Sequence, residues 1–299
     1  VAILDAGQIT LVAEKERLKI SSQSFSSDIS GMNSADFPEV PTSIDKNADS
    51  LPMDSFLQAL SQVAFAASND ETRPILTGIL FIFEDQGLIL VATDGFRLSQ
   101  KKIKIDSLKA DLKDKRMILP KGSLSELARF SKEYENFKIL DNKGENQVIF
   151  GFPDIIFSTR TLKGEFPNFE KIIPKTSKIK LNLDKEEFLK AVKLAAVFAK
   201  DSANIVRLNV REKEVILSAE SSQSGSQETK IDAKIDSQEK LDKDGFQIAF
   251  NYRFLEELLQ VLVGEEVEMK MSETSAPCVF GDPKDASFLH LIMPVRIQS

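Results

Sequence analysis

The chain has 299 residues, of which 42% are hydrophobic and 28% are charged, and its formal net charge is −7. This composition is typical of a folded globular protein, and the length suggests two or three domains. A protein that grips nucleic acid only through its phosphates is usually basic, so the acidic balance argues against that mode of binding. We find no apolar run of 18 residues and therefore expect no membrane-spanning helix.

Cysteine and histidine each occur once, as Cys278 and His290. A single cysteine excludes a disulfide within the chain and suggests a reducing compartment. The same scarcity excludes a zinc site with four Cys or His ligands. A Cys–His dyad would require these two residues to meet, and the favoured interpretation is a buried thiol and a structural histidine.

The first 45 residues carry two strand-like segments, 9–14 and 17–22, followed by an unusual Phe-Pro step at 37–38. A helix is predicted over 54–68, because apolar residues recur there with helical spacing. Two apolar-rich strands around a charged turn follow at 76–95, then a helix at 121–130 and a strand at 146–152. A second Phe-Pro step comes at 166–167, 129 residues after the first.

The same order of elements then recurs. Residues 186–200 align with 54–68, and 205–221 with the strands at 76–95. Residues 252–261 align with 121–130, and 276–282 with 146–152. A period of about 130 residues predicts repeated α+β domains, each with two helices packed on about eight antiparallel strands. We expect a partial domain at 1–45 and complete domains at 46–174 and 175–299, with much of the first copy missing before Val1.

Six segments in order resemble the bacterial sliding clamp, the beta subunit of DNA polymerase III. They are DETRPILTGILF (70–81), ATDGFRL (92–98), LPKGSLSEL (119–127), GEFPNFEKIIP (164–174), FNYRFL (250–255) and MPVRI (293–297). The resemblance implies a cytoplasmic processivity factor of DNA replication. It would have no cofactor, no metal and no catalytic site of its own.

The resemblance further implies a head-to-tail homodimer whose domains close into a ring around duplex DNA. Such a ring is held by topology, so its contacts to phosphate can stay weak and independent of sequence. Candidate DNA-facing residues on the repeated helices are Arg129, Lys132, Lys190, Lys193 and Lys200. The partner subunit would meet Val197 and Phe198. If only 1–45 of the first domain exists, we expect ring closure to fail while the peptide pocket persists.

The family also docks short peptides from polymerase, clamp loader and repair proteins between its second and third domains. Carried over by motif, the pocket comprises Arg73, Ile75, Leu76, Thr93, Gly95, Phe96, Arg97, Leu98, Pro167, Lys171, Ile172, Asn251, Phe254, Pro277, Leu291, Met293, Pro294, Val295 and Arg296. We expect an apolar floor that includes Leu98, and arginines at the rim that bind peptide carbonyls or carboxylates. Ile75 departs from the aromatic residue that is common in the family.

Two other interpretations stay open on the residues alone. Asp94 would suit a catalytic base or a magnesium ligand, but no second carboxylate at motif spacing and no glycine-rich phosphate loop accompanies it. The sequence therefore does not favour an enzyme. A non-catalytic α+β repeat scaffold that binds only proteins would show the same repeat, and only the six collinear motifs argue against it.

Overall fold

The computed structural model describes residues 7–33, 35, 40–105, 108, 111–238, 241 and 245–296. The chain divides into two compact units, Val1–Thr42 and Ser43–Ser299. The Phe-Pro step at 37–38 lies outside the described residues. The predicted domain limits after residues 45 and 174 stay predictions.

The first unit is a three-stranded antiparallel sheet in the order β1-β2-β3. Its strands are β1 (Thr10–Glu14), β2 (Arg17–Ser21) and β3 (Ser26–Ser30). Leu11 and Ile29 are exposed, because a three-stranded sheet has no second layer of its own to cover them.

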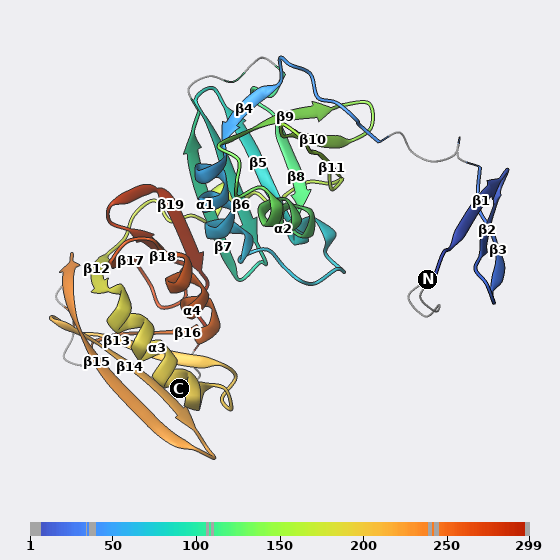
Figure 1. Ribbon diagram of the computed structural model, residues 1–299. Coiled ribbons are helices and arrows are strands. Elements are labelled where there is room, and N and C mark those ends of the chain that lie inside the picture. Colours follow the sequence, from blue (N-terminus) through green and yellow to red (C-terminus); the bar gives the residue numbers. More distant parts are fainter. Residues whose placement is uncertain are drawn as a thin grey trace. The chain divides into compact units, whose positions relative to one another are not determined.

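The second unit contains two copies of one α+β arrangement, which we call repeat A and repeat B (Figure 1). Repeat A has the helices α1 (Met53–Ala64) and α2 (Lys121–Phe130). Its strands are β4 (Asp49–Pro52), β5 (Gly78–Glu84), β6 (Gly87–Thr93), β7 (Arg97–Lys104), β8 (Arg116–Pro120), β9 (Asn136–Asn142), β10 (Gln147–Gly151) and β11 (Ile156–Arg160).

Repeat B has the helices α3 (Lys185–Ala199) and α4 (Tyr252–Val261). Its strands are β12 (Ile179–Asp184), β13 (Ile205–Val210), β14 (Glu214–Ser221), β15 (Gly225–Ser237), β16 (Phe246–Asn251), β17 (Glu266–Met271), β18 (Cys278–Asp282) and β19 (Asp285–Ile292). Side-chain caps set both helix starts, since Asp184 accepts a hydrogen bond from the Glu187 N–H (2.9 Å) and Asn251 from the Arg253 N–H (3.0 Å).

Each repeat has its own apolar core between its helices and its sheets. Phe56, Phe81 and Phe137 fill the core of repeat A, and Phe188 and Phe250 that of repeat B. The helices align as the sequence repeat requires, α1 with α3 and α2 with α4. The predicted α+β class with two complete copies is therefore confirmed.

The two repeats share one continuous sheet of twelve strands, in the order β16-β13-β14-β15-β12-β17-β18-β19-β7-β6-β5-β8. They join where β19 of repeat B pairs antiparallel with β7 of repeat A, from Phe288 opposite Lys101 to Ile292 opposite Arg97. The remaining strands of repeat A form a second sheet in the order β11-β10-β9-β4. In the described part of the chain, no helix is both long and apolar enough to cross a membrane.

Candidate peptide-binding site at the junction of the two repeats

The turn from Thr93 to Arg97, between β6 and β7, is fixed by its own hydrogen bonds. The Thr93 hydroxyl donates to the Arg97 carbonyl (2.6 Å), and Asp94 Oδ1 accepts from the N–H groups of Phe96 (2.9 Å) and Arg97 (3.0 Å). Gly95 has a φ of 95°, in the left-handed region that glycine adopts without strain. This tight turn leaves the Phe96 side chain 60% exposed.

The C-terminal segment lies against this turn. The Met293 N–H donates to the Phe96 carbonyl (2.8 Å), and the Val295 N–H donates to the Ala249 carbonyl (2.8 Å). The structure thus brings residues of the ATDGFRL and MPVRI motifs together, although about 200 residues separate them in the sequence.

An apolar cluster lies beneath these two segments, on the face of the shared sheet opposite the two domain cores. Its buried members are Leu80, Ile82, Val91, Leu98, Ile118, Phe169 and Leu291, with Ile75 and Met293 packed against them. Leu98 and Leu291 are fully covered. The expectation that Leu98 forms the surface of an apolar floor is therefore corrected. Leu98 is covered, and among the predicted apolar pocket residues Phe96 and Ile172 are exposed while Met293 is partly covered.

The structure also corrects the expected place of Arg97, which does not lie at a rim. Its side chain is only 8% exposed. Its Nε pairs with Asp94 (3.1 Å), its Nη1 with Glu257 (2.5 Å), and its Nη2 donates to the Phe65 carbonyl (2.9 Å). The guanidinium lies over the rings of Phe254 (4.5 Å) and Phe65 (5.3 Å). These contacts hold Arg97 inside the junction, away from an incoming ligand.

The other predicted pocket residues differ in their exposure and contacts. Arg73 is exposed and pairs with Asp70 (3.2 Å), and Gly95 lies close to it. Asn251 caps α4, so its side chain already has a structural partner. The described residues show no hydrogen bond, ion pair or ring contact between Pro167, Lys171, Pro277 or Arg296 and the rest of the predicted pocket. Partly covered members are Ile75, Leu76, Phe254, Pro277, Met293, Pro294 and Val295.

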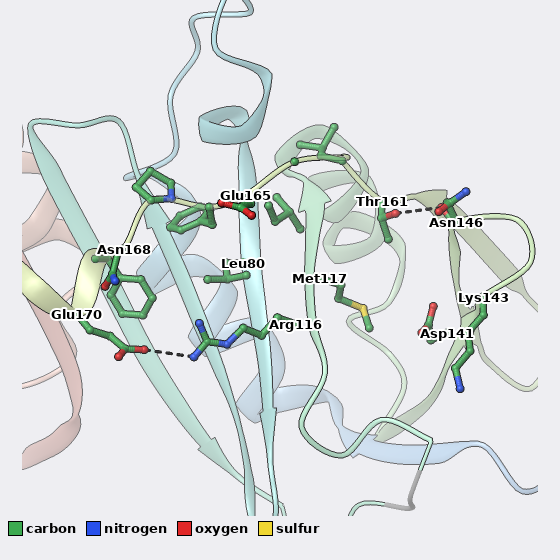
Figure 2. Close-up of a pocket in the computed structure, with 16 residues that line it drawn as sticks. Leu80, Arg116, Met117, Asp141, Lys143, Asn146, Thr161, Glu165, Asn168 and Glu170 are labelled. Carbon is green, nitrogen blue, oxygen red and sulfur yellow. Dashed lines mark hydrogen bonds and ion pairs between the residues drawn. The ribbon is translucent and has the colours of Figure 1, made fainter.

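A groove that the sequence did not predict lies next to this region (Figure 2). It has a volume of about 670 Å³ and runs between β8, the hairpin of β9 and β10, and the segment 161–170. Arg116 reaches across it to Glu170 (3.3 Å). Pro167 is the one predicted pocket residue among those that line it. The groove is formed by tertiary packing of distant segments, so no local sequence pattern marks it.

The predicted DNA-facing residues lie on or just after helices and are exposed. Arg129 on α2 pairs with Glu126 (2.9 Å), Lys132 follows that helix, Lys190 and Lys193 lie on α3, and Lys200 ends it. Val197 on α3 is 61% exposed, whereas Phe198 packs against the core of repeat B.

The residues considered for catalysis are Asp94, Cys278 and His290, and their surroundings in the structure favour structural roles. Both Asp94 oxygens are hydrogen-bonded within its own turn. Burial raises the pKa of the Cys278 thiol far above its ordinary value. Burial, together with the positive charge of Arg97, lowers the pKa of His290 to about 3. Among the described residues, neither His290 ring nitrogen has a hydrogen-bond partner, so this imidazole is not placed to take a proton from the Cys278 thiol.

Comparison with known proteins agrees with this geometry. Residues 50–168 match the family model for the DNA polymerase III beta subunit, central domain, and residues 170–296 match that for its C-terminal domain. The beta sliding clamp of Bacillus subtilis (strain 168) is 29% identical over 271 residues, which cover 90% of this chain and 69% of that protein. The beta sliding clamp of Staphylococcus aureus (strain Mu50) is 28% identical over 270 residues, with the same coverage.

Solved structures show the same fold. The DNA polymerase sliding clamp from Bacillus subtilis superposes with a TM-score of 0.81 at 27% identity, covering 97% of this chain and 75% of that one. The beta subunit from Thermotoga maritima gives 0.80 at 24% identity, covering 97% and 76%. The chain therefore belongs to the family of DNA polymerase III beta subunits, the bacterial beta sliding clamps.

Proposed function

We propose that this chain is a processivity factor that encircles duplex DNA and tethers polymerase, clamp loader and repair proteins. The observation that carries the proposal is the meeting of the Phe96 turn with the Met293 segment at the junction of repeats A and B. In a member of the sliding-clamp family, this junction is the expected place of the peptide pocket. The proposal assigns no reaction and no cofactor to the chain.

The ligand of this junction is a short peptide of the type Gln-Leu-x-Leu-Phe. Phe96, Ile172 and Met293 offer it apolar surface, and the unbranched Met293 side chain can adapt to different partners. Arg73 supplies an exposed guanidinium for peptide carbonyls or a carboxylate. The buried Leu98 and Leu291 underneath keep the site preorganised, which lowers the entropy cost of binding.

Around DNA, we propose a head-to-tail dimer with α3 at the subunit contact, provided that the first domain is complete. The exposed Val197 offers apolar surface there, and the partly buried Phe198 next to it anchors that surface to the core. Exposed lysines on the same helix would make weak electrostatic contacts with DNA phosphates. Such contacts do not depend on the DNA sequence and allow the ring to slide.

The pocket can be tested by fluorescence polarisation with a labelled Gln-Leu-x-Leu-Phe peptide. Residues that are exposed or only partly covered are the right ones to change, because truncating the buried Leu98 would also loosen the sheet. The variant Phe96→Ala with Ile172→Ala and Met293→Ala should weaken binding by about thirtyfold or more. Val263→Ala is the control, since Val263 is apolar and 63% exposed but is not one of the predicted pocket residues. Unaltered binding by the triple variant would refute this pocket.

The DNA role needs a separate experiment. The chain is loaded onto nicked circular DNA with a bacterial clamp loader and ATP, and the DNA is then linearised. A topological clamp stays on the circle at high salt and leaves after linearisation, whereas a contact binder follows the salt concentration. Peptide binding without retention on the circle would refute encirclement of DNA by this chain and leave its peptide-binding role standing.

A further inference from the structure

Arg97 connects the two repeats through a single side chain. From repeat A it contacts the Asp94 carboxylate and the Phe65 carbonyl, and from repeat B it contacts the Glu257 carboxylate and the Phe254 ring. Because the guanidinium is largely shielded from water, charge-assisted hydrogen bonds there are stronger than on an open surface.

The same residue terminates the turn that carries Phe96. The Arg97 N–H donates to Asp94, and the Arg97 carbonyl accepts from Thr93, so the position of this residue fixes the shape of the turn. Glu257 lies on α4 of repeat B, 160 residues further along the chain. Among the described residues, its carboxylate makes the one ion pair between Arg97 and repeat B.

The charges around this pair are balanced. Lys121, at the start of α2, is a second cation in the field of Arg97, Glu257 and Asp94. Burial lowers the pKa of Lys121, the positive charge of Arg97 lowers it further, and the carboxylates of Glu257 and Asp94 oppose that shift. Loss of Glu257 would leave two partly buried cations with only Asp94 as counter-charge, which favours movement of the Arg97 side chain.

We propose that Glu257 is a positioning residue for the peptide pocket: it holds the Arg97 guanidinium in the junction and so keeps the Phe96 turn in its binding shape. Glu257 does not need to touch the peptide for this role. The inference rests on the proposed peptide-binding function and extends it to a residue on the helix of the other repeat, outside the predicted pocket.

The test measures peptide affinity and the shape of the turn separately, in the whole chain. Glu257→Ala and Glu257→Gln are compared with Glu256→Ala. Within the described part of the chain, the Glu256 carboxylate on the same helix accepts only a long hydrogen bond from Gln260 (3.5 Å). Peptide Kd is measured by polarisation. Without peptide, hydrogen exchange is followed at the Phe96 and Arg97 amides, which donate to Asp94.

We expect Glu257→Ala to weaken peptide binding about tenfold and to speed exchange at both amides. Glu257→Gln keeps the side-chain length, so its peptide Kd should lie between those of Glu257→Ala and the unaltered chain. The peptide Kd of Glu256→Ala should stay within about twofold of that of the unaltered chain. Thermal melts identify any variant that fails to fold, and Glu257→Gln then supplies the comparison. If a folded Glu257 variant binds the peptide with unchanged affinity, the positioning role of Glu257 is refuted, while the proposed peptide-binding function still stands. No peptide binding by the unaltered chain would overturn the proposed function as well.

Discussion

Leu98 and Leu291 lie directly opposite each other where β7 of repeat A pairs with β19 of repeat B, and both are fully covered. This contact joins the two repeats through apolar packing as well as through the backbone. Leu291→Ala should therefore lower the free energy of unfolding by about 2 to 5 kcal/mol, the usual cost of a cavity left by a truncated leucine. Urea unfolding measures it. Leu194→Ala on the exposed face of α3 should cost less than about 1 kcal/mol. Equal losses of stability in the two variants would contradict the packing of Leu291 between the repeats.

A largely buried ion pair lies on the same two strands. The Lys101 ammonium contacts the Asp285 carboxylate, and the two side chains are 9% and 28% exposed. Asp285→Asn should lower the free energy of unfolding by about 2 to 3 kcal/mol, somewhat less than for a completely buried pair. The neighbouring pair of Lys102 and Glu84 is exposed, so Glu84→Gln is the control and should cost less than about 1 kcal/mol.

The Asp285 pair has a defined pH dependence. Burial raises the pKa of Asp285, but the hydrogen bonds from Lys101 and Ser287 outweigh burial and hold it below the ordinary value of 3.8. A carboxyl group with a lowered pKa in the folded state stabilises the fold above its unfolded pKa and loses this effect as the pH falls through the folded value. The loss in free energy of unfolding caused by Asp285→Asn should thus stay constant from pH 8 to pH 5. A loss that shrinks within that range would contradict the ion pair between Lys101 and Asp285.

His290 should also make the fold less stable in acid, but from a higher pH than Asp285 does. Its ring stacks on Phe65 at 5.1 Å, and neither ring nitrogen has a hydrogen-bond partner among the described residues. The folded state keeps the imidazole neutral down to about pH 3, whereas the unfolded chain protonates it near pH 6.5. Acid therefore stabilises the unfolded state, and this costs about 1.4 kcal/mol for each pH unit below 6.5.

Replacement of His290 by phenylalanine keeps a ring against Phe65 and removes the titrating group. The His290→Phe variant should match or exceed the unaltered chain in stability at pH 7.5, because no unpartnered polar ring is buried. The difference in free energy of unfolding between His290→Phe and the unaltered chain should grow in favour of the variant as the pH falls from 6 to 4. Urea unfolding at several pH values checks this, and an advantage independent of pH would show that His290 is already charged in the fold.

Much of the fold was predictable from periodicity. The apolar spacing at 54–68 and 186–200 marked α1 and α3, and the offset near 130 residues located the second copy of each element. The pocket motifs also contain Phe96 and Met293, whose backbones are joined by a hydrogen bond in the structure. Periodicity reports which face of an element is apolar, so it predicts cores well.

The inward position of Arg97 was not predictable in this way. Two of its side-chain partners lie 32 residues before it and 160 residues after it, and the turn that carries it has no periodic pattern. An arginine in a loop is usually exposed, and only the packing of repeat A on repeat B shows that this one is not. The burial of Leu98 under Phe96 and Met293 has the same cause.

Gly164 lies in the segment after β11, and its substitution tests how this segment shapes the pocket. Its φ is 138°, where a side chain is strained, and a methyl group there would lie 2.7 Å from Ile75 Cδ1. Gly164→Ala should therefore cost about 1 to 3 kcal/mol of stability and weaken peptide binding, because Ile75 must move. Gly122→Ala is the control, since no atom lies within 4 Å of its added methyl group and alanine favours the α2 helix.

A second substitution separates the two causes of this effect. Ile75→Ala in the Gly164→Ala background removes the crowded side chain but leaves the strained backbone. If steric contact dominates, the stability cost of Gly164→Ala should be smaller in the Ile75→Ala background than in the unaltered chain; if backbone strain dominates, the two costs should be equal. Urea unfolding of the four proteins in this cycle measures the coupling. Unchanged stability and peptide affinity in Gly164→Ala would contradict the close contact between Gly164 and Ile75.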